Sequence, residues 1–154
     1  SPWVDRVIAG GAAPGRRLLG PTKGTHIVVR RFPGFAGQAM YAEAPSDGRP
    51  FFIIPWNRLV LIGTTDTRFD GDPSTARATE AEVAYLLEAT RGVFPRTAPG
   101  RHDVLYAYAG VRPLPRQGIR ETAAITRRHH VRQHATLRGL FNVVGGKLTT
   151  FRSL

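Results

Sequence analysis

The 154-residue chain contains no cysteine, and only two of its 22 basic residues are lysines. Without cysteine it forms no disulfide bond, which fits a reducing compartment. Its longest apolar runs, at 51–56 and 59–62, are far shorter than the roughly 20 residues that cross a bilayer as a helix. The sequence shows neither a signal-peptide pattern nor an initiator methionine. We therefore expect an excised piece of a longer protein.

The composition is that of a globular domain with a strong positive charge. Hydrophobic residues make up 42% of the chain, charged residues make up 21%, and the net charge is +11. A basic chain of this kind binds nucleic acid, an anionic membrane surface or a small anionic substrate. The arginines are scattered in short pairs, at 16–17, 30–31 and 127–128, and no nucleic-acid motif accompanies them. A nucleic-acid-binding module stays open as an alternative at this point.

Short apolar segments separated by turn residues predict a chain of strands. Residues 9–24 are rich in glycine and proline, and they predict a loop. Asp47-Gly48 and Asn57 predict tight turns between neighbouring strands. The predicted strands are 25–31, 38–43, 50–56, 58–64, 103–111, 123–133 and 140–144.

One segment has the pattern of an amphipathic helix. Thr79 and Glu82 have the spacing of a capping box, and Pro95 ends the helical pattern, so the helix is predicted near 80–93. One helical face then carries Val83, Leu86, Leu87, Thr90 and Val93. Strands outnumber helices and are joined by short turns. The prediction is an α+β domain, with a mostly antiparallel sheet and this helix packed on one face.

The sequence does not match the familiar motifs for binding a dinucleotide, a phosphate, calcium or another metal. No G-x-G-x-x-G is present, and in the glycine-rich segment 15–25 the lysine comes two residues too late for a phosphate loop. The aspartates at 66, 70 and 72 resemble a calcium loop, but Arg68 and Arg77 occupy ligand positions. We expect those aspartates to cap turns. His129, His130 and His134 do not predict a metal site, because adjacent strand residues point to opposite faces.

Both lysines lie in glycine-rich, hydroxyl-flanked segments. Lys147 follows an apolar run and Gly145-Gly146, and a helix predicted from Leu148 onward would aim free N–H groups at an anion. The alternative is a surface lysine after a tight turn. Lys23 lies close to His26 at the start of a strand.

His26 and Arg112 are the other candidate functional residues. His26 suits a proton acceptor, and its alternative is a partly buried, hydrogen-bonded histidine. Arg112 ends a strand before Pro113, which suits bidentate binding of a carboxylate or phosphate. The alternative for Arg112 is a structural salt bridge.

Taken in order, these segments resemble the FAD-dependent glycerol-3-phosphate dehydrogenases. The matching segments are PWVD (2–5), KGTHIVV (23–29), IGTTD (62–66), GDP (71–73), Glu82 with YLL (85–87), YAGVRPL (108–114), TR (126–127) and GGKLTTFR (145–152). Three positions depart from the family pattern: Thr25 replaces a usual Ser, Phe151 a usual Tyr, and Arg128 a common acidic residue. The family's N-terminal glycine-rich FAD loop and its C-terminal helical domain have no counterpart in the sequence.

The resemblance implies the substrate domain of a flavin oxidoreductase of the D-amino-acid-oxidase-like type. Residues 1–24 would be a loop from the FAD domain, and residues 25–138 would form the substrate-binding domain. Residues 139–154 would be a returning strand and helix start of the FAD domain. Lacking the dinucleotide loop, the isolated chain is expected neither to hold FAD nor to be active.

The activity that the resemblance implies is oxidation of sn-glycerol 3-phosphate to dihydroxyacetone phosphate. A hydride passes to FAD, and the electrons pass to a quinone. The complete enzyme would be cytoplasmic and peripheral at the inner face of the cytoplasmic membrane, with no nucleic acid or metal involved. Another flavin-dependent amine or hydroxy-acid oxidase is the second alternative, although an arginine-rich site favours phosphate.

The resemblance also implies roles for individual residues. The catalytic candidates are His26 as the base, Arg112 and Lys147. Arg127 and Lys23 would bind the substrate, with Arg112 helping to anchor it. The candidate cofactor-binding residues are Gly145, Gly146, Leu148, Thr149 and Thr150.

Overall fold

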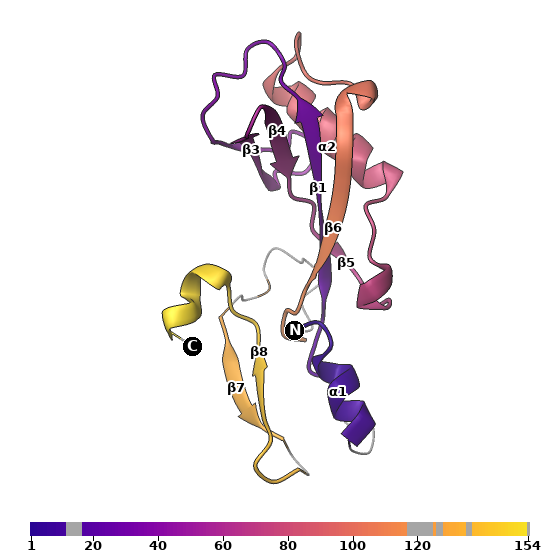
Figure 1. Cartoon of the computed structure of the whole chain (residues 1–154), viewed down its shortest axis with the longest axis vertical. Helices are drawn as coiled ribbons and strands as arrows, with labels where there is room; N and C mark the ends of the chain where they lie inside the picture. Colours follow the sequence, from indigo (N-terminus) through magenta and orange to yellow (C-terminus); the bar gives the residue numbers. More distant parts are fainter. Residues whose placement is uncertain (12–16, 117–124, 126–127, 135–136, 154) are drawn as a thin grey trace. The chain divides into compact units, whose positions relative to one another are not determined.

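The computed structural model describes residues 1–11, 17–116, 125, 128–134 and 137–153 (Figure 1). The helices are α1 (Val4–Gly11) and α2 (Glu80–Val93), with short 3₁₀ segments η1 (Pro73–Thr75), η2 (Arg101–Asp103) and η4 (Leu148–Ser153). The strands are β1 (Thr22–Arg30), β2 (Met40–Glu43), β3 (Pro50–Trp56), β4 (Leu59–Gly63), β5 (Thr67–Arg68), β6 (Val104–Arg112), β7 (His130–Gln133) and β8 (Phe141–Val144).

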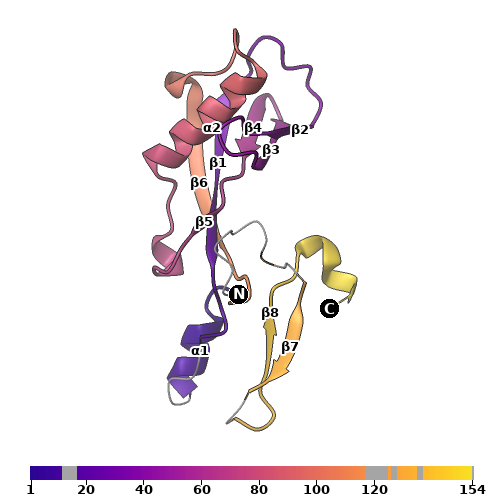
Figure 2. The same ribbon diagram turned by 180° about the vertical axis from the view of Figure 1, so that it is seen from behind.

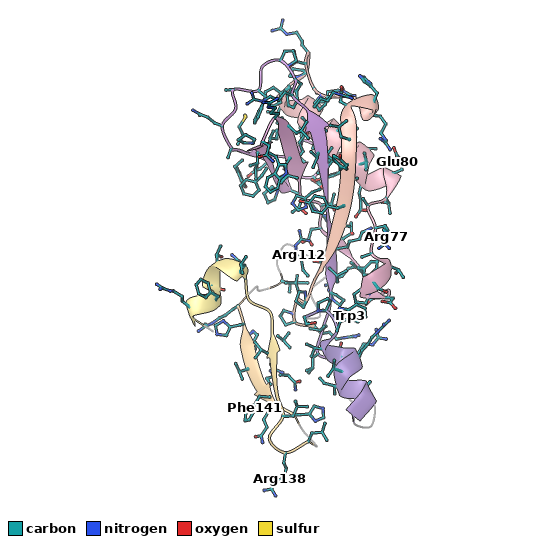
Figure 3. The ribbon with its side chains drawn as sticks, viewed as in Figure 1. Trp3, Arg77, Glu80, Arg112, Arg138 and Phe141 are labelled. Atoms are coloured by element: carbon teal, nitrogen blue, oxygen red, sulfur yellow. The ribbon has the colours of Figure 1, made fainter. Side chains whose placement is uncertain are left out.

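The residues form two compact units, which are described separately. The sheet unit contains Gly24–Thr65 and Ala76–Gly110. The hairpin unit contains Ser1–Lys23, Asp66–Thr75 and Val111–Leu154. The antiparallel pair β7–β8, which gives the hairpin unit its name, forms a separate two-stranded sheet. Phe141 lies on this pair (Figure 3).

The predicted antiparallel sheet is confirmed. Its strand order is β2-β3-β4-β1-β5, and β6 also pairs with β1. The pairs β2–β3, β3–β4 and β4–β1 are all antiparallel. Gly48 and Asn57 have positive φ angles in the turns predicted for them. Figure 2 shows α2 beside these strands from behind.

The core of the sheet unit lies between one face of the sheet and α2. Alternate residues of β1, β3 and β4 are fully buried, as the strand period of two requires. The buried members of this cluster are Ile27, Val29, Phe51, Ile53, Val60 and Ile62 from the strands, Val83, Leu86, Leu87 and Ala89 from the helix, and Ala44. The predicted apolar face of the helix therefore faces the sheet.

The start of α2 has the predicted capping box. The Thr79 hydroxyl accepts a hydrogen bond from the Glu82 backbone N–H (3.3 Å), and the Glu82 carboxylate accepts one from the Thr79 backbone N–H (2.9 Å). These bonds satisfy two donors that a helix start leaves without partners.

Thr79→Ala should therefore lower the free energy of unfolding by about 0.5–2 kcal/mol, since the cap oxygen is lost. Thr79→Ser keeps that oxygen and should stay close to wild type. Urea unfolding followed by circular dichroism measures both. Equal losses in the two variants would show that the hydroxyl does not cap α2.

Four predicted elements differ in the structure. Residues 4–11 form α1 although 9–24 was predicted as a loop, and Asp5 ties α1 to the chain by accepting hydrogen bonds from Leu18 N (2.9 Å) and Leu19 N (3.2 Å). The first strand begins at Thr22 instead of 25, because Thr22 and Lys23 pair with β5. Tertiary pairing outweighs the local turn signal there.

The C-terminal part was also mispredicted in detail. The strand predicted at 123–133 is the shorter β7, and residues 117–124 and 126–127 lie outside the described part. The helix predicted from Leu148 is the six-residue 3₁₀ segment η4, with non-helical backbone angles at Thr150. Over the residues described, no helix is both long and apolar enough to cross a membrane.

Asp72 caps a turn, as predicted for this aspartate. Its Oδ1 accepts hydrogen bonds from Ser74 N (2.9 Å) and Ser74 Oγ (2.7 Å), and its Oδ2 lies 2.8 Å from Arg6 Nη2. The Ser74 hydroxyl, followed by the Ser74 N–H and Arg6, lowers the pKa of this carboxyl from 3.8 to about 2.

A carboxyl titration checks this arrangement. Because the folded-state pKa is depressed, the contribution of Asp72 to stability is present above pH 4 and is lost as the pH falls through about 2. Ser74→Ala should raise the pKa of Asp72 more than Arg6→Ala does, since the hydroxyl is the larger cause. Carbon-detected NMR of the Asp72 carboxyl measures its pKa in each variant. If Arg6→Ala raised this pKa more than Ser74→Ala did, Arg6 and not Ser74 would be the main cause of the depressed pKa.

Candidate functional site

A row of cross-strand partners places His26 on the face of the sheet opposite α2. The register pairs Tyr41 with Phe52, Phe52 with Gly63, and Gly63 with His26. Directly opposed residues in antiparallel strands share one face. The next row along the strands, which includes Ile53, Ile62 and Ile27, packs toward the helix. We call Tyr41, Phe52, Gly63 and His26 the open row.

Two neighbours define where the His26 ring lies. The ring stacks on Tyr108 of β6, with centroids 5.2 Å apart and planes 10° apart. A Cβ atom on Gly63 would overlap the His26 imidazole. His26 is half-buried, so it retains access to a ligand and also fits the alternative of a partly buried histidine.

The backbone just before His26 is held by a buried hydrogen-bond network. Thr25 N donates to Thr65 Oγ1 (2.9 Å), and Thr65 N donates to Thr25 O (3.2 Å). Thr65 Oγ1 in turn donates to Glu82 Oε1 (3.4 Å). All three side chains are buried. The capping glutamate of α2 therefore also supports the strand that carries His26, a link that helical and strand periodicity do not reveal.

In the hairpin unit, Arg112 forms an ion pair with Asp66. Arg112 Nη1 lies 3.1 Å from Asp66 Oδ1, and the two side chains are 23% and 13% exposed. Arg112 is labelled in Figure 3. The salt bridge that the sequence left as an alternative is thus present. Such a pair also fixes a guanidinium in place. The catalytic role of Arg112 stays a prediction.

The glycine corner before Lys147 has the backbone that only glycine adopts readily. Gly145 and Gly146 have φ angles of +82° and +90°. Gly145 N donates to Pro113 O (3.3 Å), and a Cβ on Gly145 would overlap the Arg128 carbonyl oxygen. The structure therefore brings the segment that follows Arg112 next to the corner that precedes Lys147.

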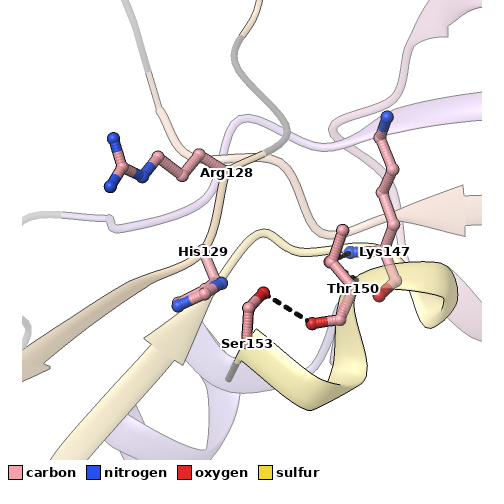
Figure 4. Close-up of a pocket in the computed structure, with 5 residues that line it drawn as sticks. All are labelled: Arg128, His129, Lys147, Thr150 and Ser153. Carbon is pink, nitrogen blue, oxygen red and sulfur yellow. Dashed lines mark hydrogen bonds between the residues drawn. The ribbon is translucent and has the colours of Figure 1, made fainter.

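An open pocket of about 450 Å³ lies at this corner, lined by Arg128, His129, Lys147, Thr150 and Ser153 (Figure 4). The Thr150 hydroxyl accepts from Lys147 N (3.1 Å) and donates to Lys147 O (3.0 Å), and it closes a tight turn. Lys147 and Arg128 extend in different directions from the pocket. The pocket is rich in cationic and hydroxyl groups, which suit an anion.

The helix predicted to open at Leu148 is present as a short 3₁₀ segment, η4. The segment after Lys147 is a short, kinked 3₁₀ turn, because the Thr150 side chain satisfies backbone groups that an α-helix would use. The Lys147 side chain at this corner is exposed, and its role in charge stabilisation stays a prediction. Leu148 and Thr149 are exposed as well.

The remaining predicted residues have mixed outcomes. Lys23 is buried on β1, with its ammonium 6.0 Å from the centroid of the Phe69 ring, and its role in substrate binding stays a prediction. Arg127 lies outside the described residues.

His26 and Lys147 belong to different units, so their predicted convergence on one pocket also stays a prediction. Within the described part of the chain, no three His, Asp or Glu side chains form a group that would hold a metal.

Comparison with known proteins places these features in a family. A family model described as FAD dependent oxidoreductase matches residues 1–151. Glycerol-3-phosphate dehydrogenase of Synechocystis sp. is 44% identical over 99% of this chain and 29% of its own length. Aerobic glycerol-3-phosphate dehydrogenase of Staphylococcus saprophyticus is 35% identical over 99% of this chain and 27% of its own length.

A solved structure agrees with these sequence matches. The glycerol-3-phosphate dehydrogenase of Bacillus halodurans, complexed with FAD, superposes with a TM-score of 0.69 and 37% identity. The superposition covers 75% of this chain and 23% of that one. The chain thus spans less than a third of the length of each of these relatives, and the resemblance inferred from its motifs is confirmed.

Proposed function

Because this chain belongs to the FAD-dependent oxidoreductase family, we propose that it is the substrate-binding segment of an enzyme that oxidises sn-glycerol 3-phosphate to dihydroxyacetone phosphate. The observation that carries the proposal is the match of 99% of the chain to glycerol-3-phosphate dehydrogenases. We assign residues 25–138 to substrate binding, residues 1–24 to a connection from the FAD domain, and residues 139–154 to a return into it.

The proposed chemistry follows the residue roles that the family resemblance implies. Arg112, Arg127 and Lys23 bind the phosphate dianion of the substrate. His26 accepts the proton of the secondary hydroxyl, because hydride loss from that carbon leaves a carbonyl only if the O–H bond also breaks. The compact Lys147 ammonium stabilises negative charge near the reacting atoms.

FAD fits the glycine corner of the hairpin unit. Gly145 and Gly146 carry no side chain, and at Gly146 an added Cβ would meet only the His129 Cβ at 3.6 Å, so the backbone there is open to close approach. Gly145, Gly146, Leu148, Thr149 and Thr150 would contact the cofactor. When bound, FAD supplies the acceptor for the hydride. We further propose that a quinone takes the electrons and that the complete enzyme is peripheral at the inner face of the cytoplasmic membrane.

The test measures substrate-dependent reduction of a soluble quinone analogue by the full-length, FAD-loaded enzyme that contains this segment. Glycerol 3-phosphate should be oxidised, and glycerol, lactate and alanine should not. Turnover of lactate or alanine instead would favour the other flavin oxidases. Salt-dependent nucleic-acid binding without turnover would favour the basic module.

Arg127→Ala should raise the KM for glycerol 3-phosphate by about 10- to 100-fold, because a charged hydrogen bond to a remote phosphate is lost. Arg138, an exposed arginine of the hairpin unit (Figure 3), provides the matched control. Arg138→Ala should leave KM unchanged in steady-state assays. An unchanged KM in Arg127→Ala would remove Arg127 from the substrate site.

A further inference from the structure

We propose that Tyr108 and Gly63 orient the His26 imidazole for proton transfer, Tyr108 by stacking on the ring and Gly63 by leaving the space that the ring occupies. The inference rests on the proposed function, in which His26 accepts the hydroxyl proton. Neither residue is assigned contact with the substrate. Both are positioning residues that act through His26.

The Tyr108 contact fixes the plane in which the ring nitrogens lie. The two planes are 10° from parallel at a centroid distance of 5.2 Å, which is an offset-stacked arrangement. Rotating the imidazole out of this plane breaks the stack. Both nitrogens of a stacked imidazole lie on the ring edge, so the stack uses one face of His26 and leaves proton transfer to the edge.

Gly63 leaves the space that the His26 ring occupies. Its φ angle is not among the positive values of the chain. It is the direct register partner of His26 on β4, and an added Cβ would overlap the Cδ2 and Cγ atoms of the imidazole. Even alanine at position 63 therefore has to push the ring off its place beside Tyr108.

The stack also favours the protonated product of the proton transfer. A cation over an aromatic face is attracted by the negative charge of the ring. His26 gains a positive charge when it takes the substrate proton, so contact with Tyr108 strengthens as the charge develops. Loss of the stack should consequently lower kcat and leave KM largely unchanged.

The first experiment compares variants of the full-length, FAD-loaded enzyme. Tyr108→Leu should lower kcat by about 3- to 10-fold with unchanged KM, and Tyr108→Phe, which keeps the stack, should restore turnover. Tyr106 is the matched control, because it is two residues away on β6 and 66% exposed. Tyr106→Leu should match wild type. Equal losses in the variants at 106 and 108, or no rescue by Phe, would overturn the inference.

The second experiment makes Gly63→Ala in the wild-type enzyme, where turnover should fall, and places both Tyr108→Leu and Gly63→Ala in a His26→Ala background. If both residues act through His26, neither substitution should lower the residual turnover further, and Gly63→Ala should be tolerated once the ring is absent. A full additional loss in this background would show that Tyr108 or Gly63 acts in another way. Melting temperatures of all variants distinguish a loss of folding from a loss of orientation.

A third measurement does not depend on activity. The NMR signals of the His26 ring protons should carry a ring-current shift that disappears in Tyr108→Leu and persists in Tyr106→Leu. If the wild type does not oxidise glycerol 3-phosphate but the shift behaves as expected, the proposed function fails and the orientation of His26 stands. If the wild type is active and the shift is the same in all variants, only this inference fails.

Discussion

His26→Ala in the complete enzyme is expected to lower kcat for glycerol 3-phosphate by about 10²- to 10⁴-fold, which is the usual contribution of a general base. The expected change in KM is small, because the imidazole takes the proton in the transition state and does not hold the phosphate. His26 is half-buried on the face of the sheet opposite α2, and its ring is stacked on Tyr108. Steady-state kinetics over a range of substrate concentrations separates the two constants.

A second histidine controls for the loss of an imidazole in general. The His102 side chain is 85% exposed in η2, and His102→Ala should keep both constants at their wild-type values. If His26→Ala raised KM and left kcat unchanged, His26 would be a binding residue and the base would have to be sought elsewhere. Full activity of His26→Ala would remove it from the site.

Leu86→Ala is expected to lower the free energy of unfolding by about 2–5 kcal/mol. Leu86 is fully buried between α2 and the sheet, where its neighbours belong to several different strands. Removing the isobutyl group loses apolar burial and leaves a cavity that the surrounding strands cannot close without breaking their register. Chemical denaturation followed by tryptophan fluorescence measures the change.

Leu148, which is 91% exposed in η4, provides the matched leucine. Leu148→Ala should change the unfolding free energy by less than about 0.5 kcal/mol. If Leu86→Ala were equally mild, the helix would not be packed on the sheet as described. A changed denaturant dependence without a changed midpoint would indicate an altered unfolded state instead.

Features that depend on neighbouring residues could be predicted from the sequence. The strands predicted at 50–56 and 58–64, the turns at Gly48 and Asn57, and the capping box of α2 all appear in the structure. Each is set by local backbone geometry or by hydrogen bonds a few residues apart. The ordered motifs likewise predicted the family, which comparison confirmed.

Features that depend on distant partners were missed or left open. The early start of β1 depends on pairing with β5, and Asp5 ties α1 to the backbone of Leu18 and Leu19. The sequence offered a salt bridge as one reading of Arg112, and the fold supplied Asp66 as the partner. At the C-terminal end, the helix predicted from Leu148 takes the 3₁₀ form, and the Thr150 hydroxyl accepts a hydrogen bond from Lys147 N.

For the candidate site too, some features were visible in the sequence and others came only from the tertiary structure. The sequence by itself determined which side chains are candidates for the chemistry, because a histidine, two lysines and an arginine before proline in glycine-rich segments are visible residue by residue. Only the tertiary structure decided that His26 lies across from Gly63 and stacks on Tyr108. Strand register is a property of paired segments far apart in the chain, and a shift of one residue would have turned His26 toward the helix.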